Sequence, residues 1–183
     1  SSTGGPEALS RLLRGFGRDF RTPIVICQHM PPKFTEILAA NLTRVSGLEC
    51  REAEHGETIR PGRVYIAPGD NHMLIRKAAD GNNGEIVLSN APPEHFCRPA
   101  VDPMFRSLAE SFGGRTLAIV LTGMGHDGAD GAVKLAAKGA HIIVQDKESS
   151  IVWGMPGAVH NTGVADAALP VDKLAQYTRK ICK

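Results

Sequence analysis

A serine, a histidine and an aspartate in this sequence have the side-chain types needed for acyl transfer. Ser2 stands in the segment SSTGG, His29 in QHM and Asp127 in TGMGHDGA. A serine attacks a carbonyl carbon at neutral pH when an imidazole accepts its proton and a carboxylate orients that imidazole. Ser2, His29 and Asp127 are therefore candidates for nucleophile, general base and orienting acid, in that order.

Glycines beside these residues indicate a place for a developing negative charge. Gly4 and Gly5 let the chain turn into a helix N-terminus, and Gly123 and Gly125 free the backbone around Met124. A backbone N–H that points at the substrate oxygen stabilises the tetrahedral intermediate of acyl transfer. The sequence therefore predicts an oxyanion hole that includes the backbone N–H of Met124.

Each candidate also has a structural interpretation. Ser2 and Thr3 are of the types preferred at helix N-caps. His29 at a strand end fits a structural histidine, and Asp127 fits another helix N-cap. No single motif distinguishes these interpretations from catalysis.

Metal binding and phosphate binding are alternatives from other functional classes. His126 and Asp127 could bind a metal ion with His29, but no further ligand at helical spacing completes the set, so we expect no metal and no other cofactor. The glycine-rich loops match neither nucleotide-binding fingerprint, although helix N-termini bind phosphate without one. A phosphate- or nucleotide-binding α/β module using these loops stays open as a second hypothesis.

Strands and helices alternate at both ends of the sequence. Apolar runs predict strands, and apolar residues at helical spacing predict helices, with a loop around residues 155–156. Short segments between turns predict short strands and hairpins over residues 49–89. The longer strands are expected at residues 23–28, 116–121 and 140–145, and helices after residue 5, from residue 34, and at 101–111, 128–137 and 171–181.

This alternation predicts an α/β fold with a doubly wound, mainly parallel sheet, helices on both faces and a short antiparallel hairpin region. In such sheets, ligands bind at the carboxyl edge of the strands. His29 and Asp127 follow predicted strands, and Ser2 precedes the first helix. The fold class therefore places all three candidates at one edge.

The composition excludes several classes of protein. The chain has 183 residues, enough for one domain with its own core, and a net charge of +2 that argues against nucleic-acid binding. Its apolar runs are too short for a membrane span, so no membrane insertion is expected. The four cysteines lack any Cys-x-x-Cys spacing, which favours reduced thiols.

Six ordered motifs together resemble the catalytic domain of the CheB-type protein-glutamate methylesterases of bacterial chemotaxis. They extend over almost the whole chain. They are residues 2–8 (STGGPEA), 28–34 (QHMPPKF), 65–73 (YIAPGDNHM), 98–102 (RPAVD), 121–129 (LTGMGHDGA) and 152–156 (VWGMP).

The resemblance implies a serine hydrolase that demethylates γ-glutamyl methyl esters on the cytoplasmic helices of methyl-accepting chemotaxis receptors, releasing methanol, and that also deamidates receptor glutamines. It implies Ser2, His29 and Asp127 as the catalytic triad, Met124 as a backbone oxyanion donor, and Thr3 and Arg98 as second-layer or substrate-placing residues. Receptor docking without chemistry is a third hypothesis.

The resemblance also carries expectations about the whole protein. Family members usually carry an N-terminal receiver domain, which signals by phosphorylation. We expect residues 1–183 to form a single catalytic domain that lacks its first strand and has no receiver domain. The expected location, as for a chemotaxis signal-transduction enzyme, is the cytoplasm.

Overall fold

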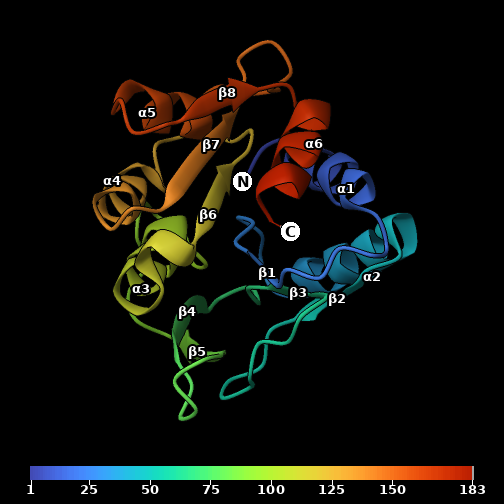
Figure 1. The fold of residues 1–183 in the computed structure, drawn as a ribbon, viewed down its shortest axis with the longest axis vertical. Helices are drawn as coiled ribbons and strands as arrows, with labels where there is room; N and C mark the ends of the chain where they lie inside the picture. Colours follow the sequence, from blue (N-terminus) through green and yellow to red (C-terminus); the bar gives the residue numbers. More distant parts are fainter. Residues whose placement is uncertain (183) are drawn as a thin grey trace.

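The structure, a computed structural model, describes residues 1–182 and has an α/β fold (Figure 1). Its α-helices are α1 (Gly5–Phe16), α2 (Phe34–Ser46), α3 (Val101–Ser111), α4 (Ala129–Ala137), α5 (Met155–Asn161) and α6 (Val171–Ile181). Its strands are β1 (Ile24–Ile26), β2 (Glu49–Glu52), β3 (Arg63–Ile66), β4 (His72–Lys77), β5 (Gly84–Ser89), β6 (Leu117–Val120), β7 (His141–Gln145) and β8 (Ala167–Leu169). A short 3-10 helix, η1 (Gly113–Arg115), precedes β6.

The parallel strands form two three-stranded sheets, with the orders β1-β3-β2 and β6-β7-β8. In the first sheet Val25 lies opposite Tyr65, and in the second Ile119 lies opposite Ile143. Strands β4 and β5 form a separate antiparallel pair. The expected fold class, mainly parallel with a short antiparallel region, is confirmed.

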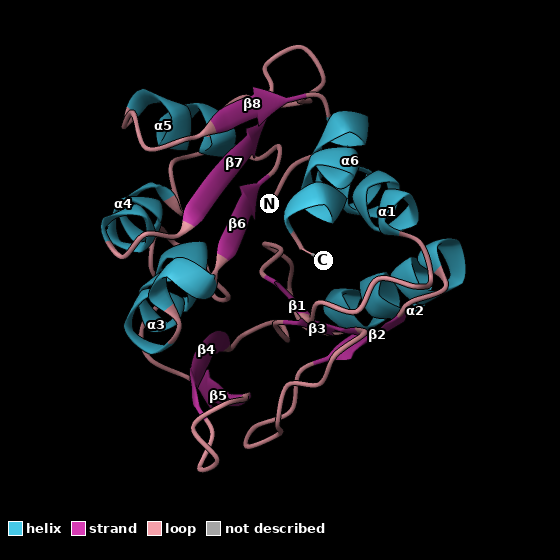
Figure 2. Cartoon of the chain, viewed as in Figure 1, coloured by secondary structure: helices cyan, strands magenta, loops and turns pink. Residues whose placement is uncertain are grey.

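Helices cover both faces of the strands because the central strand is apolar on both sides. Ile142, Ile143 and Val144 of β7 are completely buried. Ile142 and Val144 belong to the core under α3, α4 and α5, whereas Ile143 belongs to the core under α1, α2 and α6. Figure 2 shows these two groups of helices on opposite sides of the strands. No helix in the described part of the chain is long and apolar enough to cross a membrane.

Two local expectations differ from the structure. Strands β2 and β3 pair in parallel with each other rather than as a hairpin, since turn-rich composition does not determine strand direction. Met155–Asn161 is helix α5 rather than a loop, because Pro156 lies in its first turn, where the missing N–H is tolerated. The structure also contains strand β8, for which the sequence analysis makes no prediction.

A gap separates the two parallel sheets, between the edge strands β1 and β6. It contains a cavity of about 690 Å³ lined largely by apolar side chains of β1, β6, α1 and α3. At one end of the gap, Ser1 N donates to Cys27 O at 3.1 Å and Ser2 N donates to Thr122 O at 3.0 Å. Ser1 and Ser2 therefore connect the segment that follows β1 with the segment that follows β6.

Candidate active site

The Ser2 hydroxyl lies against the loop that follows β6. The backbone N–H of Met124 donates to Ser2 Oγ at 2.9 Å. This approach requires glycine at position 123, because a Cβ there would lie 2.7 Å from Ser2 Oγ. Helix α1 begins after Gly4 without a side-chain cap. The interpretation of Ser2 as a helix cap is therefore wrong, and its hydroxyl is directed at the predicted oxyanion donor.

Gln28 holds the Ser2 backbone, and the sequence analysis did not single it out. Its Nε2 donates to Ser2 O at 3.0 Å and its Oε1 accepts the Ser1 hydroxyl at 2.6 Å. The amide fits against the first turn of α1 only because position 5 is glycine, where a Cβ would lie 2.0 Å from Oε1. The one feature of the sequence that could have indicated this role is the position of Gln28 directly before His29, in QHM.

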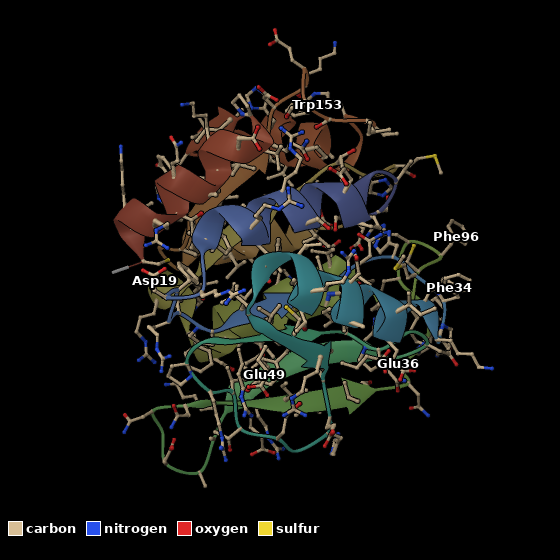
Figure 3. All side chains as sticks on the ribbon, turned by 90° about the vertical axis from the view of Figure 1, so that its right-hand side faces the viewer. Asp19, Phe34, Glu36, Glu49, Phe96 and Trp153 are labelled. Carbon is tan, nitrogen blue, oxygen red and sulfur yellow. The ribbon has the colours of Figure 1, made fainter. Side chains whose placement is uncertain are left out.

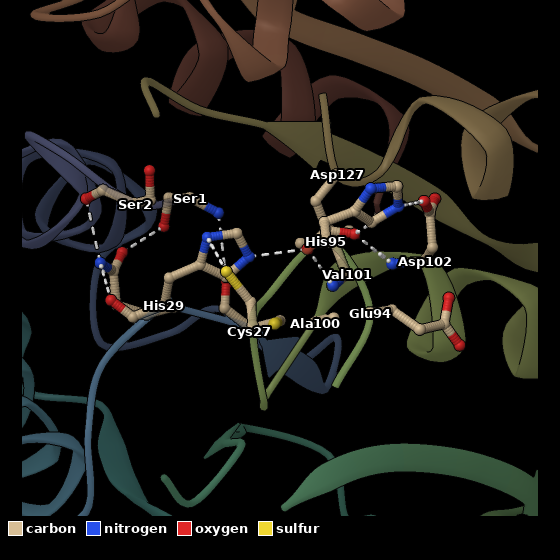
Figure 4. Close-up of polar contacts among 12 residues, drawn as sticks. Ser1, Ser2, Cys27, His29, Glu94, His95, Ala100, Val101, Asp102 and Asp127 are labelled. Carbon is tan, nitrogen blue, oxygen red and sulfur yellow. Dashed lines mark hydrogen bonds and ion pairs between the residues drawn. The ribbon is translucent and has the colours of Figure 1, made fainter. Parts of the chain in front are cut away.

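His29 and Asp127 form a hydrogen-bonded pair at the carboxyl edge of the two sheets (Figure 4). His29 Nε2 lies 2.7 Å from Asp127 Oδ2, and the two side chains are 13% and 2% exposed. Since the carboxylate accepts the Nε2 proton, Nδ1 is the basic nitrogen of the ring. The structure thus places an imidazole, oriented by a buried carboxylate, beside the end of β1.

The carboxylate of Asp127 is held by the N-terminus of α3. Its Oδ2 accepts the N–H of Val101 at 2.6 Å, and its Oδ1 accepts the N–H of Asp102 at 2.9 Å. Burial opposes ionisation, but these bonds and the one from His29 together lower the pKa of Asp127 below its ordinary value. Asp127 does act as a helix cap, but for α3 rather than for the helix that follows it in sequence.

Ser2 and His29 are neighbours that are not hydrogen-bonded. Within residues 1–182, Ser2 Oγ pairs with the Met124 N–H, and His29 Nδ1 lies 3.5 Å from Cys97 Sγ. Burial raises the pKa of Cys97, and the charge of Asp127 adds to the rise, so the group at Nδ1 is a thiol. Catalytic hydrogen bonds are often unformed before substrate binds. The candidates are therefore brought together as two pairs, Ser2 with Met124 and His29 with Asp127.

Thr3 and Arg98 lie at the border of the site. The Thr3 side chain is exposed, and its carbonyl accepts the hydroxyl of Thr122 at 2.9 Å. The Arg98 guanidinium donates to Asp70 Oδ1 and to the carbonyl of Asn90. Arg98 thus connects two loops beside the site, and a role of either residue in substrate placement stays a prediction.

Beside the His29–Asp127 pair lies a cluster of side chains that could bind a metal ion, but it is not the set that the sequence suggested. Among the described residues, the His95, Asp102 and Asp127 side chains offer ligand atoms within 4.8 Å of one another, and neither His126 nor His29 belongs to this group. Each carboxylate already accepts backbone N–H groups, Asp127 from α3 and Asp102 from Gly131. The cluster therefore has the character of a hydrogen-bond network. Neither His95 nor Asp102 was a candidate in the sequence analysis.

Large apolar side chains are exposed around the site. Met124 follows the Gly123 turn, and Ile151 lies against Gly4, where a Cβ would approach it within 2.8 Å. Phe34, at the start of α2, and Phe96 are also exposed, and both project from the same edge of the molecule in Figure 3.

Comparisons with known proteins agree on one family. A family model described as CheB methylesterase matches residues 1–178. A protein-glutamate methylesterase/protein-glutamine glutaminase of Caulobacter vibrioides is 54% identical over 97% of this chain and 51% of its own length. A protein of the same description from Maricaulis maris is 57% identical over 92% of this chain and 42% of its own length. The chain thus spans about half the length of these curated relatives.

A comparison with solved structures points to the same family. The crystal structure of the Thermotoga maritima CheB methylesterase catalytic domain superimposes with a TM-score of 0.94 at 40% identity. The match covers 98% of this chain and 94% of that domain. The helices, the parallel strands and the edge that carries Ser2, His29 and Asp127 therefore belong to a shared architecture.

Proposed function

The chain belongs to the CheB methylesterase family, and from this premise we propose that it is the catalytic part of a serine hydrolase that demethylates γ-glutamyl methyl esters of chemoreceptors. The observation that carries the proposal is the His29–Asp127 pair beside a serine hydroxyl that accepts the Met124 N–H. The names of the relatives support a second activity, hydrolysis of glutamine side chains.

Ser2 is the proposed nucleophile and His29 Nδ1 the proposed base. Direct proton transfer would require the Ser2 hydroxyl to leave the Met124 N–H by rotation about its Cα–Cβ bond and to replace the Cys97 thiol beside Nδ1. Asp127 would stabilise the imidazolium that results, since its carboxylate faces Nε2. The released Met124 N–H would then bind the substrate oxyanion.

The reaction would proceed through an acyl-enzyme. Ser2 Oγ attacks the ester carbonyl carbon while His29 takes the hydroxyl proton, and the tetrahedral intermediate expels methoxide, which leaves as methanol with that proton. Water then attacks the seryl ester with His29 as base, which frees the glutamate carboxylate and restores Ser2. With a glutamine substrate, ammonia would leave in place of methanol.

The proposed substrate is a receptor helix rather than a small molecule. The exposed border of Met124, Ile151, Phe34 and Phe96 supports contact with the apolar stripe of an amphipathic helix. Because these receptor helices lie in the cytoplasm, we place the protein there. A receiver domain ahead of this chain would be its second partner, in keeping with the longer relatives.

We also propose that a strand directly ahead of Ser1 completes the catalytic domain. The cavity between β1 and β6 has the apolar lining of a sheet interior, and both bordering strands are sheet edges. A segment that reaches Ser1 from within this gap would run parallel to β1 and β6. It would join the two three-stranded sheets into one.

The phosphate- or nucleotide-binding alternative is not supported. The family is one of methylesterases, and the N-terminal turn of α1 is covered by the Gln28 amide and by Ile151. A phosphate at this turn would have to displace both side chains.

The decisive experiment measures methanol release from methylated chemoreceptor by the parent protein and by Ser2→Ala. We expect at least a ~10⁴-fold loss of kcat, as for removal of a serine nucleophile. Ser10→Ala is the matched control, because Ser10 lies in the same region but donates only to Pro6 O within α1. Methanol release by Ser2→Ala at the parental rate would exclude Ser2 as nucleophile.

A further inference from the structure

The first turn of α3 binds the carboxylate of Asp127, which lies just before α4, and the first turn of α4 binds the carboxylate of Asp102, which lies in α3. Asp127, two residues before α4, accepts the N–H groups of Val101 and Asp102 at the start of α3. Asp102 in turn accepts the N–H of Gly131 in α4 at 2.7 Å. The orientation of Asp127 therefore depends on where Asp102 holds the first turn of α3.

The two helices meet too closely for any side chain at position 131. A Cβ on Gly131 would lie 2.5 Å from the Cβ of Phe105 and 3.0 Å from Asp102 Oδ1. A displaced Asp102 carboxylate would thus move the first turn of α3, and with it the two N–H groups that orient Asp127.

His95 binds the second oxygen of Asp102. Its Nε2 lies 2.7 Å from Asp102 Oδ2 and 3.9 Å from Asp127 Oδ1, and Figure 4 shows its ring beside both carboxylates. Burial raises the pKa of Asp102 against the bonds from Gly131 and His95, and the charge of Asp127 adds to the rise. A proton donated by His95 offsets the repulsion between the two buried carboxylates.

The backbone that presents His95 is unusual. His95 and Phe96 have φ angles of 52° and 62°, in the left-handed region that non-glycine residues rarely adopt. Glu94 and Cys97 close this two-residue turn with a pair of backbone hydrogen bonds, and Glu94 is anchored to Arg106 of α3. Such conformations persist where surrounding contacts enforce them and concentrate at functional sites. The turn directs His95 inward to Asp102 and Phe96 outward.

We propose that His95 and Asp102 form a second His–Asp pair, whose role is to position Asp127 for its hydrogen bond with His29. The inference rests on the proposed function, since it assigns a purpose to that hydrogen bond. Within residues 1–182, the side chains of His95 and Asp102 form no hydrogen bond with Ser2 or His29. They are therefore positioning residues that act through Asp127 and the first turn of α3.

The test compares His95→Asn with His95→Gln. Asparagine tolerates the left-handed turn but is too short to reach Asp102, whereas glutamine places an amide donor near the position of Nε2. We expect His95→Asn to lower kcat for methanol release about 10- to 100-fold, as small misplacements of catalytic groups do, with KM nearly unchanged. His95→Gln should recover most of the loss.

A second readout needs no substrate. We expect the proton between His29 Nε2 and Asp127 to give a low-field resonance in proton NMR of the parent. This resonance should shift or broaden in His95→Asn and return in His95→Gln. His55→Ala is the control, because His55 also makes one hydrogen bond, with the Leu88 N–H. It should leave kcat and the resonance unchanged.

The outcomes separate this inference from the proposed function. An unchanged resonance in His95→Asn overturns the positioning role, whatever happens to kcat. If His95→Asn only lowers Tm while kcat per folded molecule stays parental, the pair is structural and the proposal fails. If the parent releases no methanol, the proposed function fails, and the resonance still decides whether His95 positions the His29–Asp127 pair.

Discussion

The proposed catalytic groups form two hydrogen-bonded pairs, Ser2 Oγ with the Met124 N–H and His29 with Asp127. Ser2 and Met124 already meet at 2.9 Å, and His29 is held from its far side by Asp127. The approach of Ser2 to the loop after β6 depends on the absence of a side chain at position 123. At the scale of single residues, Gly123 is therefore as necessary to the Ser2–Met124 contact as Ser2 itself.

Gly123→Ala tests this dependence. A Cβ at position 123 would lie 2.4 Å from Met155 Sδ and 2.7 Å from Ser2 Oγ. We expect the overpacked variant to lose about 1–3 kcal/mol of unfolding free energy. We also expect kcat per folded molecule to fall, because Ser2 is displaced from Met124. Urea unfolding and methanol release measure the two effects.

The matched control is Gly15→Ala, where the added Cβ would lie 2.5 Å from that of Ala175, between α1 and α6. This variant should lose stability without losing kcat. Equal kcat for Gly123→Ala and the parent would contradict the role of Gly123 at the site.

At the scale of elements, the ends of strands and the N-termini of helices form the candidate site. The ends of β1 and β6 supply His29 and the Gly123 loop, while the N-termini of α3 and α4 hold Asp127 and Asp102. Helix N-termini carry partial positive charge, so α3 favours the ionised form of Asp127. Between β1 and β6, two sheet edges border an apolar cavity.

An added strand should fill that gap. We expect an extension of about five apolar, β-branched residues directly ahead of Ser1 to raise Tm, because it buries the cavity lining and pairs both edges. Thermal unfolding followed by circular dichroism measures the change. A Gly-Ser extension of equal length is the control and should leave Tm unchanged. Equal Tm values for the two extensions would argue against a strand in the gap.

The molecule as a whole combines two apolar cores with a few buried charged groups. One core lies under α3, α4 and α5 and the other under α1, α2 and α6. Asp127 and Asp102 are buried carboxylates at the first of these cores, and their pKa values move in opposite directions. The buried carboxylate of Asp127 therefore couples the stability of the fold to pH.

Acid unfolding should show this coupling. The pKa of Asp127 is lower in the folded protein than its ordinary value of 3.8, so its contribution to stability is complete above about pH 4 and is lost as the pH falls through the folded-state value. We expect Asp127→Asn to be less stable than the parent at pH 7, and the difference to shrink at pH 3. Urea unfolding at the two pH values measures it, and a difference that grows at low pH would contradict the assignment.

The amino-acid sequence predicted the fold class, its mainly parallel strands and the placement of Ser2, His29 and Asp127 near one edge, while the catalytic roles of these residues stay predictions. Apolar periodicity and the chain order of the motifs carry this information, since both are local in sequence. It did not identify Gln28, His95 or Asp102, nor the pairing of β2 with β3. Those depend on contacts between distant segments, such as the α3 N-terminus with Asp127, and on which backbone groups remain unpaired. Only the tertiary structure decides them, because a buried polar group takes whatever partner the packing brings within reach.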